Sequence, residues 1–271
     1  MNKKILILLA LLVLVPGPDG APAVAGDADV TTRNDRMKKL MERIFTGPSS
    51  SKIGYPPHPN AFLVESVKAM APGTALDVGM GQGRNAIHLA RLGWQVTGFD
   101  LSPAAIRLAR AEAEKAGVAI TAVEQSAEEF SFGSEKWDLI VLSYVEFRHF
   151  MDPIWQGLKP GGHVVVEYYH RDTRRYRPLN DDKSVATNEL LHLFGSYRIL
   201  RYEDVAARPD WMPTGDEKHR IVRLVAQKEN KGERKVCYRE GKTFSQGEEA
   251  CMGKSMWRCE KTGWIINGAC K

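Results

Sequence analysis

Three glycines alternate with larger residues directly after a short apolar segment, in the run Asp77-Val78-Gly79-Met80-Gly81-Gln82-Gly83. Glycine lets a backbone adopt positive φ and lets a ligand approach the main chain closely. In open α/β sheets such a turn follows a strand, and ligands bind at the carboxyl ends of the strands. Asp100 ends the next predicted strand, 21 residues after Gly79, which is the spacing at which an acid commonly binds ribose hydroxyls. The sequence therefore predicts a nucleoside site formed by this turn and Asp100.

A dinucleotide pattern overlaps the same turn. The run Gly81-Gln82-Gly83-Arg84-Asn85-Ala86 satisfies G-x-G-x-x-G/A, which is typical of nicotinamide-binding enzymes. Asp77 argues against this interpretation, because a carboxylate just before the glycines would repel a pyrophosphate. A ligand that carries an ammonium group would instead be attracted to Asp77. A nicotinamide-dependent reductase is therefore the alternative enzyme class, and a nucleoside joined to a cationic amino acid is favoured.

Four segments resemble, in order and spacing, the motifs of class I S-adenosylmethionine-dependent methyltransferases. The first is the glycine run itself, and the others are Val96 to Ser102, Trp137 to Val141 and Leu158 to Val166. Within this class, the segments most similar to the small-molecule branch that includes tellurite-resistance methyltransferases are Gly81 to Asn85, Thr187 to Leu191 and Arg198 to Asp204. The resemblance implies a Rossmann-like fold, S-adenosylmethionine as cofactor and methyl transfer to a small-molecule acceptor.

The resemblance also implies which residues bind the cofactor. Members of the family often have an acid near the end of the third strand that accepts from the adenine amine. This chain has Ser126 at that position, with Glu128 as an alternative acceptor, or as the start of a solvated turn, and Met80 as part of the apolar wall. The expected cofactor-binding residues are Asp77, Gly79, Met80, Gly81, Gly83, Asp100, Leu101, Ser126, Ala127 and Ser143.

The methyl acceptor should lie at the carboxyl ends of the fourth and fifth strands. Transfer from a sulfonium is an in-line displacement, to which a protein contributes mainly orientation, and a base is needed only when the acceptor must lose a proton. Candidates that follow these strands are Ser143, Tyr144, Glu146, Glu167, Tyr169, His170 and Arg171. We predict catalytic roles for His170, Tyr144 and Glu167, with His170 as the base because its unperturbed pKa is about 6.5. The alternatives are a surface-loop histidine and tyrosines that only line a cavity.

A basic run follows the fifth strand. It consists of Arg171, Arg174, Arg175 and Arg177. A solvated loop is one interpretation, and the other is that the run attracts an anionic acceptor through its electric field.

Alternating strand and helix patterns must position these residues. Predicted strands are Ala75 to Val78, Gln95 to Phe99, Val118 to Glu124, Trp137 to Ser143, Val164 to Tyr168, Tyr197 to Tyr202 and Arg220 to Ala226. Predicted helices begin at caps Asn34 and Asn60, the latter helix reaching Ala71, and span Arg84 to Leu92, Pro103 to Ala116, Met151 to Leu158 and Leu190 to Phe194. This alternation predicts the α/β class, with a mostly parallel, doubly wound sheet and helices on both faces.

Composition is that of an ordinary globular protein, with 43% hydrophobic residues and a net charge of +5 in 271 residues. No basic stripe interleaved with aromatics is present, so we expect no nucleic-acid partner. We also expect no metal site, because the cysteine spacings contain no C-x-x-C. The oligomeric state stays open.

The N-terminus has the order of a secretory signal peptide. Lys3-Lys4 precede the apolar run Ile5 to Val15, and Ala23-Val24-Ala25 has the A-x-A form of a cleavage site. The run is too short for a membrane-spanning helix, which needs about 20 residues, so we expect no stable span after cleavage; an uncleaved anchor is the alternative. The predicted organisation is a signal peptide at 1–25, a linker and helix at 26–54, a methyltransferase domain at 55–228 and a Cys-rich module at 229–271.

All four cysteines lie in the last module, at Cys237, Cys251, Cys259 and Cys270. An even count in a short exported segment predicts two disulfides, with three possible connectivities, and free thiols are the alternative. Export to the periplasm or medium conflicts with a cofactor made in the cytoplasm. A non-catalytic, nucleoside-binding scaffold is therefore a further alternative function, since a fold does not guarantee an activity.

Overall fold

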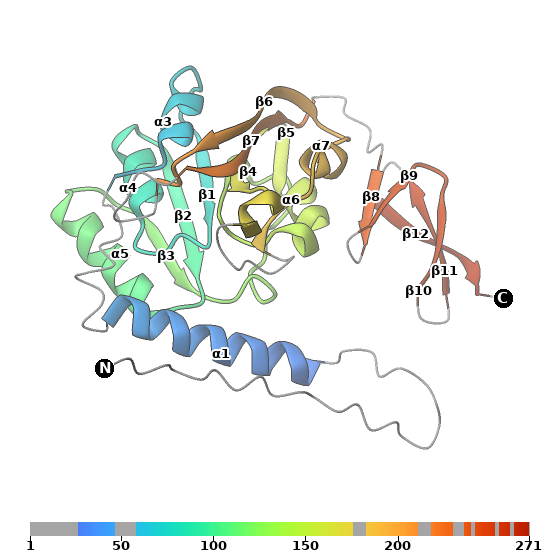
Figure 1. Cartoon of the computed structure of the whole chain (residues 1–271), viewed down its shortest axis with the longest axis horizontal. Coiled ribbons are helices and arrows are strands. Elements are labelled where there is room, and N and C mark those ends of the chain that lie inside the picture. Colours follow the sequence, from blue (N-terminus) through green and yellow to red (C-terminus); the bar gives the residue numbers. More distant parts are fainter. Residues whose placement is uncertain are drawn as a thin grey trace.

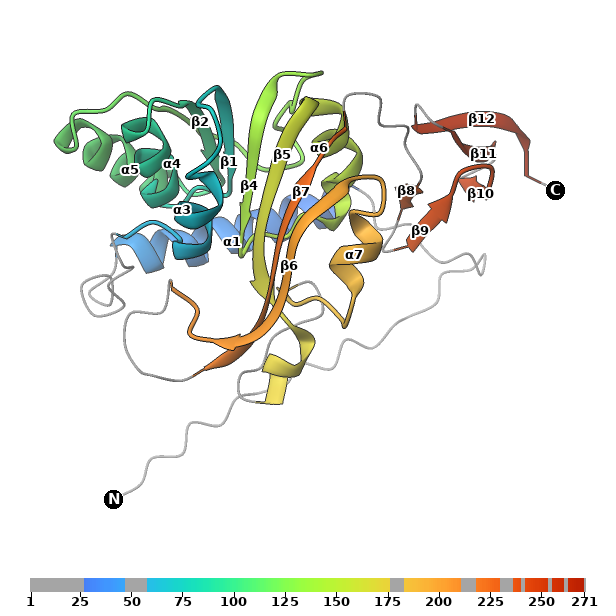
Figure 2. The ribbon, with the colours of Figure 1, turned by 90° about the horizontal axis from the view of Figure 1, so that it is seen from above.

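A seven-stranded sheet, in the order β3-β2-β1-β4-β5-β7-β6, is the centre of the computed structural model (Figures 1 and 2). The structure describes residues 27–46, 58–175, 183–210, 218–229, 236–239, 242–252, 255–260 and 263–270. The strands of this sheet are β1 Thr74–Val78, β2 Gln95–Asp100, β3 Thr121–Glu124, β4 Trp137–Ser143, β5 Leu158–Tyr169, β6 Arg198–Ala207 and β7 His219–Gln227. Strands β1 to β5 run parallel, whereas β7 is antiparallel to both β5 and β6.

The direction of the chain across the sheet reverses beside β1. From β1 the chain moves outward through β2 to β3, and then returns to β4 on the other side of β1 and continues to β5. The carboxyl ends of β1 and β4 therefore flank a topological switch point, which is where open α/β sheets bind ligands. The glycine turn follows β1, and Tyr144 follows β4.

Helices cover both faces of the sheet, and the residues of β4 alternate between them. Leu139 and Val141 pack in one core with α3 Ala61–Val67, α4 Arg84–Arg91 and α5 Pro103–Lys115. Ile140 and Leu142 pack in the other core with α6 Met151–Gly157 and α7 Glu189–Leu193. This alternation is the pattern of a strand buried on both faces. The predicted fold class, a mostly parallel sheet with helices on both faces, is confirmed.

Two helices differ from the prediction by four residues or more at one end. The helix capped by Asn60 ends at Val67 rather than at Ala71; Pro72 disfavours helical geometry at Ala71 but does not explain the earlier end. The first helix, α1 Asp27–Thr46, begins seven residues before the predicted cap Asn34, so the predictions of a cap there and of a linker up to residue 33 were wrong. No glycine or proline interrupts the segment from Asp27 to Thr46, so nothing in it breaks the helix.

The C-terminal strands form two small antiparallel sheets joined by disulfides. One is the hairpin β8 Val236–Arg239 and β9 Lys242–Ser245, and the other contains β10 Glu249–Met252, β11 Ser255–Glu260 and β12 Gly263–Ala269. Cys237 is bonded to Cys259 and Cys251 to Cys270, with Cα–Cα distances of 5.6 and 5.7 Å. The structure thus contains one of the three possible connectivities. A hydrogen bond also connects this C-terminal module to the larger domain: the Val236 N–H donates to Ser196 Oγ at 3.0 Å.

The predicted signal peptide lies outside the described residues. Within the residues that the structure describes, no helix combines the length and apolar character needed to cross a membrane.

The two disulfides should stabilise the C-terminal module unequally. Each closes a loop of similar length, 22 and 19 residues, so each should add about 3 kcal/mol through unfolded-state entropy. Cys237 and Cys259 are also fully buried, and their removal leaves a cavity. We expect C237A/C259A to destabilise the module more than C251A/C270A, as measured by hydrogen exchange of β11 amides. Equal losses from the two pairs would contradict the burial argument.

Candidate active site

The glycine turn adopts a backbone conformation that requires glycine. Gly79, Gly81 and Gly83 have φ of +63°, +54° and +81°, in the left-handed region that other residues rarely occupy. A Cβ on Gly79 would lie 2.9 Å from Val145 Cγ2, and one on Gly83 would lie 3.1 Å from Ala109 Cβ. A Cβ on Gly81 would meet nothing closer than 3.8 Å. Packing therefore constrains the outer glycines, while the main chain at Gly81 faces open space that a ligand can use.

Asp100 is bonded to this turn across the switch point. Its Oδ2 accepts from the Gly81 N–H and its Oδ1 from the Ser102 N–H, both at 2.9 Å. Burial raises the pKa of Asp100, and these two N–H donors partly offset the effect. A carboxylate has about four lone-pair positions, so two remain for ribose hydroxyls. The predicted ribose ligand thus also fixes the glycine turn, a role that its spacing did not indicate.

Asp77 is a buried carboxyl group with an unpartnered oxygen. It is 2% exposed, and its Oδ2 has no hydrogen-bond partner. Burial raises the pKa of Asp77 to about 7, with nearby Arg84 and the Ala86 N–H acting in the opposite direction. A buried anion is costly unless it is paired, so this oxygen fits a ligand that supplies a cation or an N–H donor, such as an amino-acid ammonium.

Ser126 is the other predicted cofactor residue with an unpartnered polar atom. The residue is 4% exposed, and its Oγ has no hydrogen-bond partner. Glu128, the alternative acceptor, is exposed and accepts from Asn34 of α1 at 3.4 Å. Half-buried Leu101 and Ala127 lie beside Asp100 and Ser126 along the chain. At the position where the family often has an acid, two residues after β3, the hydroxyl group of Ser126 is thus available to a ligand.

The Met80 side chain packs into the sheet and is only 5% exposed. A Cβ on Gly98 of β2 would lie 2.4 Å from Met80 Sδ, so that glycine makes room for the thioether. The role of Met80 as part of the apolar wall of the cofactor site stays a prediction. In the structure, its main chain faces the turn while its side chain belongs to the core with Leu89 and Ala109.

Helix α1 lies along the edge at which strands β1 to β3 end (Figure 1). Phe45 is the residue that a Cβ on Gly81 would approach. Glu42 accepts from Arg107 at 2.9 Å, and Lys38 pairs with Glu124 at 2.9 Å. These ion pairs are largely exposed, and such pairs contribute little stability. The contacts place α1 over the glycine turn and the end of β3.

Tyr144 and Glu167 meet at the carboxyl ends of β4 and β5. The Tyr144 hydroxyl donates to Glu167 Oε1 at 2.7 Å, and its N–H donates to the Glu167 carbonyl at 2.9 Å. Burial and the adjacent carboxylate raise the pKa of Tyr144 well above its usual value, so the phenol stays protonated. Glu167 is 1% exposed and also accepts from Asn60 Nδ2 at 2.7 Å and Arg223 Nε at 2.6 Å. Three donors occupy this carboxylate, which makes it a structural anion rather than a free base.

Sequence reasoning missed Asn60, Asn85 and Arg223 as members of the site. Asn60 was predicted only as a helix cap, and it does accept from the Leu63 N–H through Oδ1 at 2.8 Å. Asn85 Oδ1 accepts from the Asn60 N–H at 2.8 Å, and Asn85 Nδ2 donates to the Ser143 hydroxyl at 3.4 Å. The only available signal was Asn85 itself, which directly follows the glycine turn and Arg84.

Both ring nitrogens of His170 are engaged. Its Nδ1 accepts from the Asp172 N–H at 3.0 Å, so the neutral ring carries its proton on Nε2, which lies 3.1 Å from Thr187 Oγ1. The residue is 2% exposed, and burial, with Arg220 as a further cause, lowers the pKa of His170. The imidazole is therefore not a surface-loop group, and a role as base would require breaking its bond to the Asp172 N–H.

Of the remaining acceptor-side candidates, Tyr169 is buried with its ring 5.0 Å from that of Tyr144, whereas Glu146 and Arg171 form ion pairs. Glu146 and Glu189 both bind Arg148, at 2.9 and 2.6 Å. Arg171 lies 3.8 Å from Glu189. Of the other arginines in the basic run, Arg177 and the side chains of Arg174 and Arg175 are outside the described part of the chain. Attraction of an anionic acceptor by this run stays a prediction.

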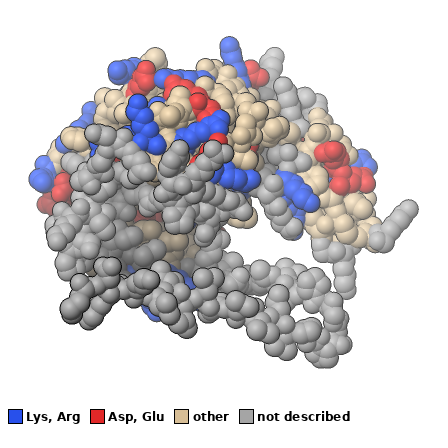
Figure 3. Space-filling view, viewed as in Figure 1, with Lys and Arg blue, Asp and Glu red and all other residues tan. Residues whose placement is uncertain are grey.

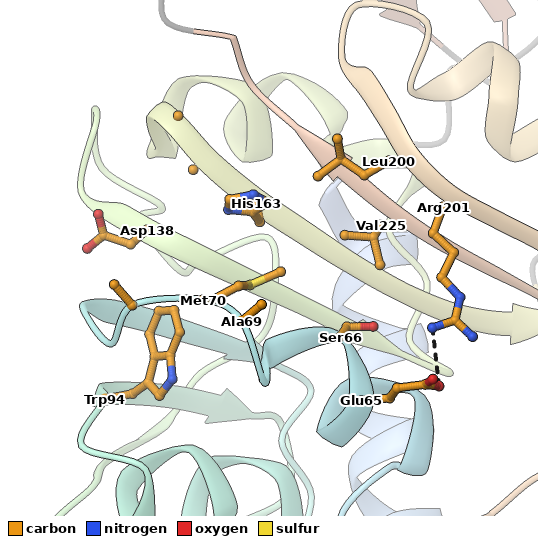
Figure 4. A pocket seen from close by; sticks show the side chains of 13 residues that line it. Glu65, Ser66, Ala69, Met70, Trp94, Asp138, His163, Leu200, Arg201 and Val225 are labelled. Atoms are coloured by element: carbon orange, nitrogen blue, oxygen red, sulfur yellow. Dashed lines mark ion pairs between the residues drawn. The ribbon is translucent and has the colours of Figure 1, made fainter.

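A hollow of about 570 Å³ lies elsewhere, at the amino ends of the parallel strands (Figure 4). Trp94, Asp138 and His163 line one part of it, and the Glu65–Arg201 ion pair, at 3.1 Å, lies at another. Open α/β sheets bind their substrates at the opposite edge, so we do not assign the active site to this hollow.

Charged residues on the face shown in Figure 3 are mixed in sign, without a patch of one sign. In the described segments, no three His, Cys, Asp or Glu side chains are grouped so as to bind a metal ion.

The central part of the chain is similar in sequence to known methyltransferases. Residues 75–162 match a family described as a methyltransferase domain. A ubiquinone biosynthesis O-methyltransferase of Methylobacterium sp. (strain 4-46) is 34% identical over 108 residues, which cover 38% of this chain and 43% of the relative. One from Serratia proteamaculans is 28% identical over 42% of this chain and 50% of the relative. The chain thus spans half or less of the length of these relatives.

Solved structures show the same fold. TehB from Haemophilus influenzae superposes with a TM-score of 0.54 at 22% identity, covering 70% of this chain and 67% of TehB. A protein described in the conversion of a disulfide bond into a thioacetal group during echinomycin biosynthesis has a TM-score of 0.58 at 22% identity, over 72% of this chain and 94% of its own. At these identities the likeness concerns the fold alone.

The raised pKa of Asp77 has a consequence for stability. An acid with a higher pKa in the folded than in the unfolded state favours folding when protonated, so its contribution is lost as pH rises from about 4 to 7. Asp77→Asn should therefore stabilise the ligand-free protein at pH 8, by on the order of 4 kcal/mol, and less at pH 5. Urea unfolding at the two pH values measures this, with exposed Asp35→Asn as control. An equal gain at both pH values would refute the burial argument.

Two buried polar atoms without hydrogen-bond partners suit the ends of S-adenosylmethionine. Asp77 Oδ2 fits its ammonium group, and Ser126 Oγ fits its adenine. The sheet order and the solved neighbours agree with this interpretation. Residues 75–162 therefore match the methyltransferase domain family, and the fold around them is one that solved S-adenosylmethionine-dependent methyltransferases share.

Proposed function

We propose that this protein is an S-adenosylmethionine-dependent methyltransferase that acts on a small-molecule acceptor by in-line transfer. The observation that carries the proposal is the unpartnered Asp77 Oδ2, buried directly before the glycine turn. A fully buried carboxyl oxygen without a donor is costly. Nicotinamide dinucleotides would place a pyrophosphate near it, whereas a methionine ammonium would supply the missing charge and donors.

The chain's own groups would hold the cofactor along the switch point. Asp77 would bind the ammonium, the Gly81 backbone would lie against the nucleoside, Asp100 would accept from the ribose hydroxyls, and Ser126 would contact the adenine. Once bound, the cofactor supplies an electrophilic methyl group on a sulfonium. The protein then contributes orientation, which is worth up to about 7–11 kcal/mol where geometry is good.

The acceptor would approach from the ends of β4 and β5, where Tyr144 is held by Glu167. Of the predicted catalytic residues, Glu167 is contacted by three donors, and both ring nitrogens of His170, the predicted base, have hydrogen-bond partners. Acceptors that are already nucleophilic near neutral pH suit this edge better than those that must lose a tightly held proton. The curated relatives are named as O-methyltransferases, which adds oxygen acceptors to the candidates.

We expect replacement of Gly81 or Asp100 to weaken cofactor binding specifically. Asp100→Ala should reduce S-adenosylmethionine or S-adenosylhomocysteine affinity at least about tenfold, as measured by calorimetry, because a hydrogen bond to a charged group is worth about 1.5–3 kcal/mol. Gly81→Ala should also reduce it, because a Cβ would strain the positive φ and occupy space next to the backbone that the ligand would contact. Gly117→Ala is a matched control, since Gly117 also has positive φ, +68°, but no atom within 4 Å of an added Cβ. Unchanged affinity in folded G81A and D100A would remove the assignment.

The same titrations separate the alternative functions. Tight binding of a nicotinamide dinucleotide would indicate a reductase. Binding of S-adenosylmethionine without formation of S-adenosylhomocysteine, across a panel of thiols, phenols, amines and chalcogen oxyanions, would indicate a non-catalytic scaffold.

The proposal extends to export, which would place the protein in the periplasm or the medium. It is supported by the signal-like N-terminal sequence and by two bonded cysteine pairs, since disulfides persist in oxidising compartments. We expect the unreduced exported chain to have the mass of residues 26–271, less the hydrogens lost in two disulfides. A chain lacking residues 2–25 is the control and should keep its thiols. Full-length chain with free thiols in the cytoplasm would contradict the proposal.

A further inference from the structure

The hollow at the amino ends of the parallel strands has the size of a small-molecule site. Its volume of about 570 Å³ lies within the range of about 300–1,000 Å³ that is typical of ligand pockets. Residues 69–71, which follow the last helical residue of α3, Val67, line one side of it. His163 of β5 and Val225 of β7 line the side of the sheet (Figure 4). The early end of α3 thus leaves this part of the sheet open to a ligand.

A β-bulge in β6 directs an apolar side chain to the same hollow. The register of β6 with β7 shifts between Ile199 and Arg201, so Leu200 is the inserted residue. Leu200 and Arg201 both line the hollow, although successive side chains of a regular strand point to opposite faces. Bulges of this kind re-aim side chains and are frequent beside functional sites. Because Leu200 is 45% exposed, the bulge presents an apolar surface to an occupant of the hollow.

Polar atoms along the hollow are mainly hydrogen-bond acceptors. Asp138 Oδ2 accepts from the Thr74 N–H, the Thr74 hydroxyl and Lys159 Nζ, each at 2.8 Å, and no donor of the described chain binds Asp138 Oδ1. Burial opposes ionisation of Asp138, but the Lys159 and Thr74 donors outweigh it and lower its pKa, so the carboxylate is charged at neutral pH. The Ser66 hydroxyl donates to the Phe62 carbonyl at 2.6 Å, which leaves only its lone pairs for other contacts.

The charges that line the hollow favour a cationic ligand. Among the described lining side chains, Arg201 is the only permanent cation, and it is bound by Glu65 at 3.1 Å and by Glu203 at 2.7 Å. His163 is half-buried, and burial lowers its pKa, so its ring is neutral near pH 7 and accepts through one nitrogen. Asp138 and Glu65 are both anionic. A ligand that carries hydrogen-bond donors and a positive charge is complementary to this set.

We propose that the hollow is a second ligand site, at the opposite edge from the cofactor, and that it binds an organic cation: a protonated amine on an apolar body. The ammonium donates to Asp138 Oδ1 beside the Trp94 ring, because carboxylates and aromatic rings both attract such a group. The apolar body lies along Met70 toward Leu200 and Val225, which Figure 4 shows on the other side of the hollow from Asp138. This inference goes beyond the proposed function and does not depend on it.

Three probes of similar size separate charge from shape. They are 2-phenylethylamine, which is protonated near neutral pH, the uncharged 2-phenylethanol and the anionic 3-phenylpropanoate. Each is titrated into the ¹⁵N-labelled full chain, and the indole N–H cross-peak of Trp94, assigned by its loss in Trp94→Phe, reports on the hollow. We expect the amine to bind with a Kd of about 1 mM, as is usual for ligands of this size. The alcohol should bind about tenfold more weakly, because it forms no charge-assisted hydrogen bond, and the carboxylate should not bind.

Two pairs of variants locate the site and test its charge. Ala69 is exposed and lines the hollow, so Ala69→Trp should fill it and abolish binding of the amine. Ala111→Trp, at an exposed position of α5, is the matched control and should change nothing. Leu200→Glu and Leu200→Lys lose the same apolar contact but differ in charge. The amine should therefore bind the Glu variant about fivefold more tightly than the Lys variant.

All these positions are exposed, so the far-ultraviolet circular dichroism of every variant should match that of the wild type. Binding of 3-phenylpropanoate as tight as that of the amine, amine binding that survives Ala69→Trp, or tighter binding to Leu200→Lys than to Leu200→Glu would each overturn the inference. A Trp94 cross-peak that the amine does not shift would do the same. A protein that fails to bind S-adenosylmethionine would refute the proposed function and leave this result unchanged, because Gly81 lies at the opposite edge of the sheet.

Discussion

Burial of carboxylates at the carboxyl edge of the parallel sheet is the constraint on which the site depends. The low dielectric strengthens every charge and hydrogen bond there, and it makes an unpaired group costly. Two of the three buried acids have a hydrogen-bond donor at each carboxyl oxygen. Glu167 accepts from three donors, and Asp100 accepts from two backbone N–H groups. Asp77 is left with one oxygen unpartnered. The edge is therefore held by hydrogen bonds around Glu167 and Asp100, while Asp77 has a buried oxygen atom that no group of the described chain contacts.

Packing on the two faces of the sheet holds this edge in place. Alternate residues of β4, such as Val141 and Leu142, belong to separate cores with helices on opposite faces. Neither face can move without disturbing close-packed side chains. By contrast, α1 is held over the edge largely by exposed ion pairs, including Lys38–Glu124. Strong packing under the site and weak contacts above it are consistent with a fixed binding surface beneath a more easily displaced helix.

The fold by itself does not establish the chemistry, because one fold hosts many activities. What narrows the function is the set of groups left without partners, together with the match of residues 75–162 to a methyltransferase domain. The C-terminal module lies outside that match. The buried Cys237–Cys259 disulfide stabilises this module internally. A hydrogen bond to Ser196 attaches the module to the larger domain. Its contribution to stability is local, since its strands form sheets of their own.

Local patterns in the sequence determined the elements and the cofactor half of the site. Gly81 has the positive φ that its spacing predicted, and Asp100 lies beside it because one βα unit of fixed length separates them. Contacts between distant residues were decided by tertiary structure alone. Asn60 and Glu167 are 107 residues apart, and no periodicity links a helix cap to a strand end. The cysteine pairing likewise depended on strand register, because all three connectivities have feasible loop lengths. The periodicity and spacing of residues in the sequence determine whether a segment forms a helix, a strand or a turn. Which hydrogen-bond donor contacts a buried carboxylate depends instead on how the helices and strands pack against one another.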